Sequence, residues 1–169
     1  MNDLTRFDPD DDENPFKTVP LQHPDARGVA IARKAFGEGT ERFAYQFFEV
    51  SADGTTVLGD PLVAKESKFV SEATTNAVKE TEKFVRRFCR INHQAAKAAA
   101  AFNAKLDSIK LLDADTARVA FLPCSVYCVS DPENGKLALG VERRLFGQFQ
   151  KWNSNNGVSC SCLVTTFVP

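Results

Sequence analysis

A long stretch with helical periodicity constrains the fold of this chain more than any other feature. Between residues 75 and 106, apolar residues recur every three or four positions, as they do along one face of an α-helix. The alanine-rich part, residues 95–101 interrupted by Lys97, favours a helix and lets another element approach closely. The expected apolar face consists of Phe84, Val85, Phe88, Ile91, Ala95, Ala99, Phe102 and Leu106.

Segments with strand character lie on both sides of the predicted helix. They are rich in β-branched and aromatic residues and are separated by turn signals. Asp53-Gly54 supplies the positive φ that a tight reversal needs, and Asn134-Gly135 is a strong hairpin signal. Strands, one long helix and further strands predict an α+β fold with a largely antiparallel, twisted sheet packed on that helix. The expected strands are residues 27–34, 43–50, 62–64, 117–129 and 137–145.

Composition argues against several classes of protein. At 169 residues, with 43% hydrophobic and 25% charged residues, the chain can bury a core and is one domain or one lobe of a larger one. The formal net charge of −1 argues against a protein that coats nucleic acid, so no nucleic-acid partner is expected. The chain starts with no secretion signal, and no run approaches the roughly 18 apolar residues of a membrane span. We therefore expect a cytoplasmic protein without membrane contact.

The first 26 residues are expected to form an acidic, disordered tail. Residues 8–13 are acidic at five of six positions, and Pro15, Pro20 and Pro24 follow. Such a stretch buries too little apolar surface to offset its ordering entropy. The tail could recruit a basic partner, but solvation alone explains its composition.

The five cysteines indicate reduced thiols more than a disulfide framework. Their number is odd and their spacing is irregular, as in cytosolic proteins. Cys124 and Cys128 lie four positions apart, and Cys160 and Cys162 two apart, so a zinc site is an alternative. Structural zinc sites usually combine tighter spacings with a matching second pair. Cys124 and Cys128 also lie in a segment with strand character, where cysteine acts as a small apolar residue. No metal ligand is predicted.

Three separated features have the chemistry of a nucleotide site. The turn containing Gly37 and Gly39 lets backbone N–H groups approach phosphates. Lys65 ends a short apolar run, where a lysine can hold phosphate oxygens, although a single lysine of this kind is more often a solvated strand end. Glu142 and Arg143 end the last strand, where backbone groups become available to a planar base. This order is that of a kinase amino-terminal lobe with its hinge.

The first half of the predicted helix is strongly charged. Its basic residues fit either a solvated helix surface or a phosphate or partner site, and the solvated surface is the simpler interpretation. Glu80 and Glu82 are both candidate ion-pair partners for Lys65, and nothing in the sequence selects between them. The basic residues are Lys79, Lys83, Arg86, Arg87 and Arg90.

Five segments together resemble the α-kinase family of atypical protein kinases. The resemblance runs from about residue 28 to Gly157 in the expected order, and elongation-factor-2 kinase and the myosin heavy chain kinases are the most similar members. The run 151–157 (Lys-Trp-Asn-Ser-Asn-Asn-Gly) and the run 63–65 (Val-Ala-Lys) are its most specific parts. The five segments are residues 35–45, 63–67, 84–89, 101–103 and 151–157.

The resemblance implies a kinase-like amino-terminal lobe and a role for each matched residue. Lys65 would contact ATP phosphate oxygens as a compact cation. The hinge, Glu142 and Arg143, would read adenine mostly through backbone groups, whereas the three asparagines after it could simply cap a turn. The implied ATP-binding residues are Gly37, Gly39, Thr40, Arg42, Lys65, Glu142, Arg143, Asn153, Asn155 and Asn156.

The resemblance also implies a carboxy-terminal lobe after Gly157, with the catalytic aspartate, Mg²⁺ ligands and a zinc site. Residues 158–169, which follow here, do not match that pattern. We therefore expect residues 27–157 to form an ATP-binding lobe and residues 158–169 an atypical tail. The chain alone is expected to be inactive, and Mg²⁺ is expected only with a complete catalytic lobe.

Two functions are consistent with these residues. Members of the family transfer the γ-phosphoryl group of ATP to Ser or Thr of a protein substrate. The alternative is a non-catalytic nucleotide-binding module, or a regulatory or interaction module. Without a second lobe, the cleft face around Val141, Leu145 and Phe146 is expected to be exposed, which favours self-association.

Overall fold

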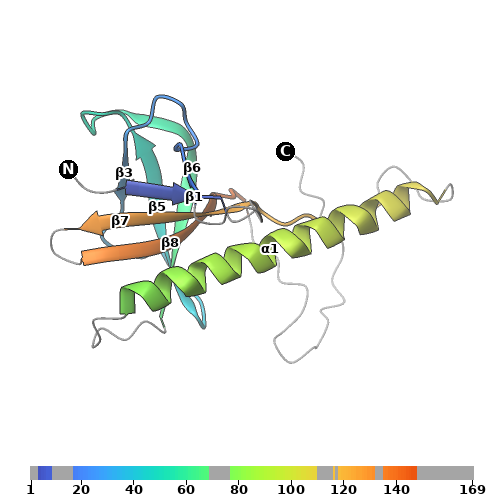
Figure 1. Ribbon diagram of the computed structural model, residues 1–169. Helices are drawn as coiled ribbons and strands as arrows, with labels where there is room; N and C mark the ends of the chain where they lie inside the picture. Colours follow the sequence, from blue (N-terminus) through green and yellow to red (C-terminus); the bar gives the residue numbers. More distant parts are fainter. Residues whose placement is uncertain are drawn as a thin grey trace.

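The computed structural model describes residues 4–8, 17–68, 77–109, 116, 118–131 and 135–147. An eight-stranded antiparallel sheet has the order β2-β1-β7-β8-β6-β5-β3, with β4 paired to β5, and α1 crosses one face of it (Figure 1). The predicted α+β fold is confirmed. The elements are β1 (Leu4–Phe7), β2 (Thr18–Val19), β3 (Gly28–Ile31), β4 (Gly37–Glu38), β5 (Arg42–Val50), β6 (Val57–Ser67), α1 (Ala77–Asp107), β7 (Cys124–Asp131) and β8 (Gly135–Arg143).

The central strands form as their sequence indicates. β5 is rich in aromatic residues and pairs with β6 along most of its length, while β3 pairs with its other edge. The turn between β5 and β6 contains Gly54 at φ 73°, whose N–H donates to the Ser51 carbonyl at 2.9 Å. The Asp53 carboxylate accepts hydrogen bonds from Ser51 and Thr55, which hold its pKa down at about 2. The predicted meander of three strands is confirmed.

The sheet has a hydrophobic core on each face. One core consists of the buried residues Phe47, Leu62, Ala64, Tyr127, Leu139 and Val141. The other joins α1 to β7 and β8 and consists of Val85, Cys89, Cys124, Val126 and Ala138. At the crossing point, a Cβ added to Gly140 would lie 3.4 Å from the sulfur of Cys124 and 3.7 Å from Val85. The small residue in β8 therefore lets the helix approach the strands closely.

The predicted helix, residues 75–106, is confirmed, but its predicted apolar face is only partly correct. Val85, Cys89 and Ala99 are buried, whereas Ile91 and Phe102 are 52% and 53% exposed. These last two lie eleven positions apart and project from one line of the helix, to the side of the buried face. The second half of α1 also extends beyond the strands (Figure 1), so no sheet covers that line.

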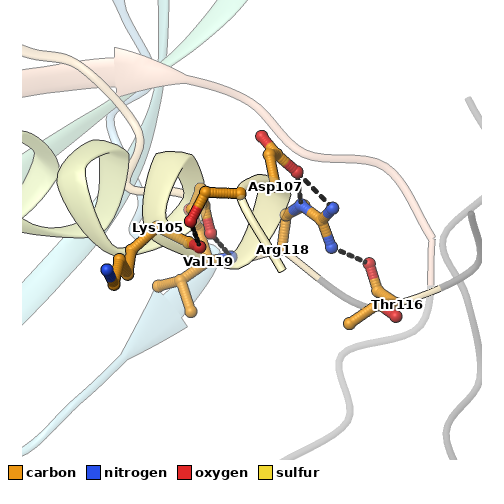
Figure 2. Close-up of polar contacts among 7 residues, drawn as sticks. Lys105, Asp107, Thr116, Arg118 and Val119 are labelled. Atoms are coloured by element: carbon orange, nitrogen blue, oxygen red, sulfur yellow. Dashed lines mark hydrogen bonds and ion pairs between the residues drawn. The ribbon is translucent and has the colours of Figure 1, made fainter. Parts of the chain in front are cut away.

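The segment before β7 runs beside α1 and is not a strand. Asn103 bonds the backbone of Val119 twice, accepting from its N–H at 3.1 Å and donating to its carbonyl at 2.7 Å. Arg118 makes an ion pair with Asp107 at the end of the helix and donates to the Thr116 carbonyl at 2.6 Å (Figure 2). A side chain of α1 thus makes hydrogen bonds to the backbone of this segment that a neighbouring strand would otherwise make. The strand predicted from residue 117 begins at residue 124 for this reason.

The prediction of a disordered tail is wrong for residues 4–8 and 17–26. β1 pairs with β7, and β2 pairs with β1, so both extend the sheet. The chain after β2 is fastened by Glu49, whose carboxylate accepts from the backbone N–H groups of Gln22 at 2.7 Å and His23 at 2.6 Å. Strand pairing and a buried carboxylate supply the order that apolar burial alone would not. Residues 9–16 lie outside the described residues.

Candidate nucleotide site

Lys65 lies in the middle of the sheet, on the face that α1 crosses. Its strand, β6, pairs with β5 and β8, so that Lys65 is opposite Ala44 on one side and Gly140 on the other. The neighbouring Ala64 is fully buried in the other core. Because side chains alternate along a strand, Lys65 points to the α1 face.

A cavity of about 470 Å³ opens beside this lysine. That volume is in the range of small-molecule sites in proteins. Four of the predicted ATP-binding residues line it together, and the three other lining residues were not predicted. The lining consists of Gly39, Thr40, Glu41, Arg42, Phe43, Ala44 and Lys65.

The turn between β4 and β5 forms another part of the cavity wall. Gly37 pairs with Ala44 in the two strands, and the turn closes where the Gly39 N–H donates to the Arg42 carbonyl at 2.8 Å. Gly37 lies at the base of this turn and is not among the residues that line the cavity. The residues at the tip of the predicted glycine turn therefore line the cavity, and the residue at its base does not.

Arg42 connects the cavity to α1. Its guanidinium lies 3.4 Å from the ring centroid of Phe88 and 5.9 Å from that of Phe84. An arginine stacked on aromatic faces loses much of its conformational freedom. Both phenylalanines were predicted as core residues of the helix. Their contact with Arg42 depends on where the helix crosses the sheet, which the sequence does not show.

Lys65 makes an ion pair with Glu142 of β8. The Glu142 side chain is 13% exposed and that of Lys65 33%, so the pair lies at the edge of the core with the lysine partly open to solvent. Of the two partners considered from the sequence, Glu82 instead pairs with Arg86 at 2.8 Å, and the side chain of Glu80 is outside the described part of the chain. The lysine has three donors, so a ligand oxygen can be bound beside the carboxylate.

The predicted hinge residues continue the sheet and do not line the cavity. Glu142 is opposite Val63 of β6, and Arg143 is opposite Leu62. The Arg143 side chain is exposed and lies 3.3 Å from the carboxylate of Asp60. The structure therefore brings Glu142 to the site through its side chain, a role that the sequence did not indicate.

The remaining predicted residues divide into two groups. Val141 is 1% exposed, so the prediction that it is exposed is wrong: it faces the core between β6 and β7. Leu145 and Phe146 are 65% and 67% exposed, as predicted. Other predicted positions lie outside the described residues: Asn153, Asn155, Asn156, Cys160 and Cys162.

The cysteines in the described part of the chain form no disulfide, and no metal cluster accompanies them. The sulfurs of Cys89 and Cys124 lie 2.8 Å apart between α1 and β7. Burial raises the pKa of the Cys128 thiol to about 11. Within the described ranges, no group of three His, Cys, Asp or Glu side chains could hold a metal ion. In the same part of the chain, no helix is long and apolar enough to span a membrane.

Solved structures of one kinase share this fold. The alpha-kinase domain of myosin heavy chain kinase A, in a complex with AMPPCP, has a TM-score of 0.62 at 19% identity, covering 94% of this chain and 66% of that chain. An inactive form of the domain complexed with ATP has a TM-score of 0.59 at 20% identity, with the same coverage. The chain thus spans 66% of the length of these domains. The predicted kinase-like lobe is confirmed.

The sequence match agrees with the fold. Among curated proteins, none matches this chain significantly. Residues 37–166 match the model of the alpha-kinase family, so the match includes residues 158–166, which the sequence analysis assigned to a separate tail. The match covers most of the chain, and it confirms the resemblance described above. The chain therefore belongs to the alpha-kinase family.

Proposed function

We propose that this chain is the ATP-binding lobe of a serine/threonine protein kinase of the alpha-kinase family. One observation carries the proposal: Lys65 and Arg42 line the same cavity as the turn at Gly39 and Thr40. Two cations beside a glycine-containing turn are elements that can hold a triphosphate. Structures of the family domain with AMPPCP and with ATP support the choice of ligand.

Each cation has a distinct part in this proposal. Lys65 acts as a compact charge for the phosphate oxygens, and Glu142 holds its side chain toward the α1 face. Arg42 is held by the ring of Phe88, so its guanidinium is already oriented before ATP binds. Because both side chains are held before ATP binds, ordering them on binding costs less entropy.

Among the described residues, no three carboxylate, His or Cys side chains gather that could hold a Mg²⁺ ion by themselves. We therefore propose no step through the ion. The chain spans 66% of the length of the solved kinase domains. Phosphoryl transfer depends on positioning groups on both sides of the nucleotide. We propose that these 169 residues bind ATP in the cytoplasm and that transfer to a Ser or Thr of a protein requires the rest of the domain.

Titration with ATP tests this proposal. We expect Lys65→Met to weaken ATP binding about tenfold or more, because a hydrogen-bonded charge is lost from the phosphates. Lys97→Met is the matched control, since Lys97 is an exposed lysine of α1. Calorimetry on folded samples provides the measurement. Equal affinity of the wild type and Lys65→Met would exclude the proposed role of Lys65, and absence of binding by the wild type would exclude the function.

A further inference from the structure

A second lysine, Lys68, directly follows β6, just beyond the end of the pairing of that strand with β5. The last paired residues are Arg42 and Ser67, and the backbone N–H of Lys68 then donates to the Glu41 carbonyl at 2.9 Å. Lys68 follows Lys65 by three positions, so the two side chains project from opposite faces of the strand. Lys65 lines the cavity, whereas Lys68 is not among the residues that line it.

The side chain of Lys68 contacts both strands of the β4–β5 hairpin. Its ammonium makes an ion pair with Glu38 of β4 and lies 4.8 Å from the ring centroid of Phe43 of β5. Glu38 and Phe43 are opposite each other in the ladder. One lysine therefore joins the two strands that lead into and out of the turn at the cavity. Its side chain is 23% exposed, compared with 64% for Glu38, so it packs on the sheet along most of its length.

The position of Glu38 gives this contact an electrostatic consequence. Glu38 immediately precedes Gly39, the first residue of the cavity wall. A carboxylate beside that wall repels a bound triphosphate, and the repulsion grows with each added phosphate. Lys68 lies on the same face of the sheet as Glu38, opposite to that of Lys65, and its ammonium compensates the carboxylate there.

Building on the proposed function, we propose that Lys68 is a positioning residue for ATP: it fixes the turn at residues 39–41 and neutralises Glu38. It acts on the phosphates through the hairpin and without touching the ligand. Two consequences separate this role from a general contribution to stability. The effect of removing Lys68 depends on the number of phosphates of the ligand, and removing the charge of Glu38 reverses part of it.

Calorimetry with ATP, ADP and adenosine tests the proposal. We expect Lys68→Met to weaken ATP binding about fivefold, as for a partly exposed ion pair with an aromatic contact, to weaken ADP binding less and to leave adenosine binding unchanged. Lys68→Arg keeps the charge and retains wild-type affinity. Adding Glu38→Gln to Lys68→Met restores part of the ATP affinity, and Lys97→Met is the control. Equal losses for ATP and adenosine, or an unchanged ATP affinity, would overturn the proposal.

Hydrogen exchange without nucleotide separates this inference from the proposed function. The amide of Gly39 donates to the Arg42 carbonyl at 2.8 Å and so reports on the closed turn. We expect Lys68→Met to speed its exchange while the amides of the β7–β8 ladder exchange as in the wild type. Unchanged exchange at Gly39 would show that Lys68 does not fix the turn, whether or not ATP binds. If Lys68→Met speeds exchange at Gly39 but the wild type does not bind ATP, the proposed function is refuted. The conclusion that Lys68 fixes the turn then still stands.

Discussion

Two glutamates of the sheet, one in each core region, have opposite surroundings. Glu49 is 1% exposed, and its carboxylate accepts three hydrogen bonds: from the N–H groups of Gln22 and His23 and from the hydroxyl of Tyr127 at 2.6 Å. Glu142 has one charged partner, Lys65, which is itself one-third exposed beside the cavity.

The difference between the partners of these two glutamates shows how to distinguish a polar group that stabilises the fold from one that lies at a candidate binding site. Every partner of Glu49 comes from the protein, and together they fasten the N-terminal segment to the sheet. Burial, and the hydrogen bond to Glu49, raise the pKa of Tyr127 far above its ordinary value, so the hydroxyl remains a donor. The pair at Glu142 keeps donors of Lys65 available to a ligand. A polar cluster whose hydrogen bonds are all made within the protein stabilises the fold, whereas one that leaves donors open is a candidate binding site.

Replacing Glu49 should have the largest effect on stability. Glu49→Ala leaves two backbone N–H groups and a hydroxyl without their acceptor inside the protein, so we expect a loss of about 3 kcal/mol in the free energy of unfolding. Urea unfolding followed by circular dichroism measures it. Tyr127→Phe is the graded control, because it removes one donor, and we expect a loss of about 1.5 kcal/mol. A loss below about 1 kcal/mol for Glu49→Ala would contradict its role as the fastening of residues 21–26.

Replacing Glu142 should have a much smaller effect on stability. In Glu142→Gln, the partly exposed ammonium of Lys65 is solvated in place of its ion pair, so we expect a loss of about 0.5 kcal/mol. The same urea experiment provides the measurement. If the two glutamates proved equally costly to replace, the distinction between a structural cluster and a binding cluster would fail.

Much of the fold could be predicted from the sequence because the dominant signals are local. The period of residues 75–106 places α1 to within two residues, and Asp53-Gly54 marks the β5–β6 turn through a positive φ. β1 and β2 could not be predicted, because they are ordered by distant partners. β1 pairs with β7, more than 100 residues away, β2 pairs with β1, and the chain after β2 is held by the carboxylate of Glu49.

In the candidate site, too, some features could be predicted from the sequence and others could not. Lys65 and the turn at Gly39 could be predicted as candidates because their residue types carry phosphate chemistry, and the structure places both beside one cavity. The side-chain role of Glu142 and the stacking of Arg42 on Phe88 were missed. Both depend on which face of a strand meets α1, and a change of one residue in register would reverse that face.

Labelling with an acyl-phosphate derivative of ATP tests the central claim most directly. An amine beside the bound phosphates attacks the acyl carbon and forms an amide, with release of the nucleotide, and mass spectrometry identifies the lysine. We expect labelling of Lys65, suppressed by excess ATP, and none of Lys68, which follows β6 and faces the opposite side of the sheet. Labelling of Lys68 in preference to Lys65, or labelling of exposed lysines that ATP does not suppress, would contradict the account.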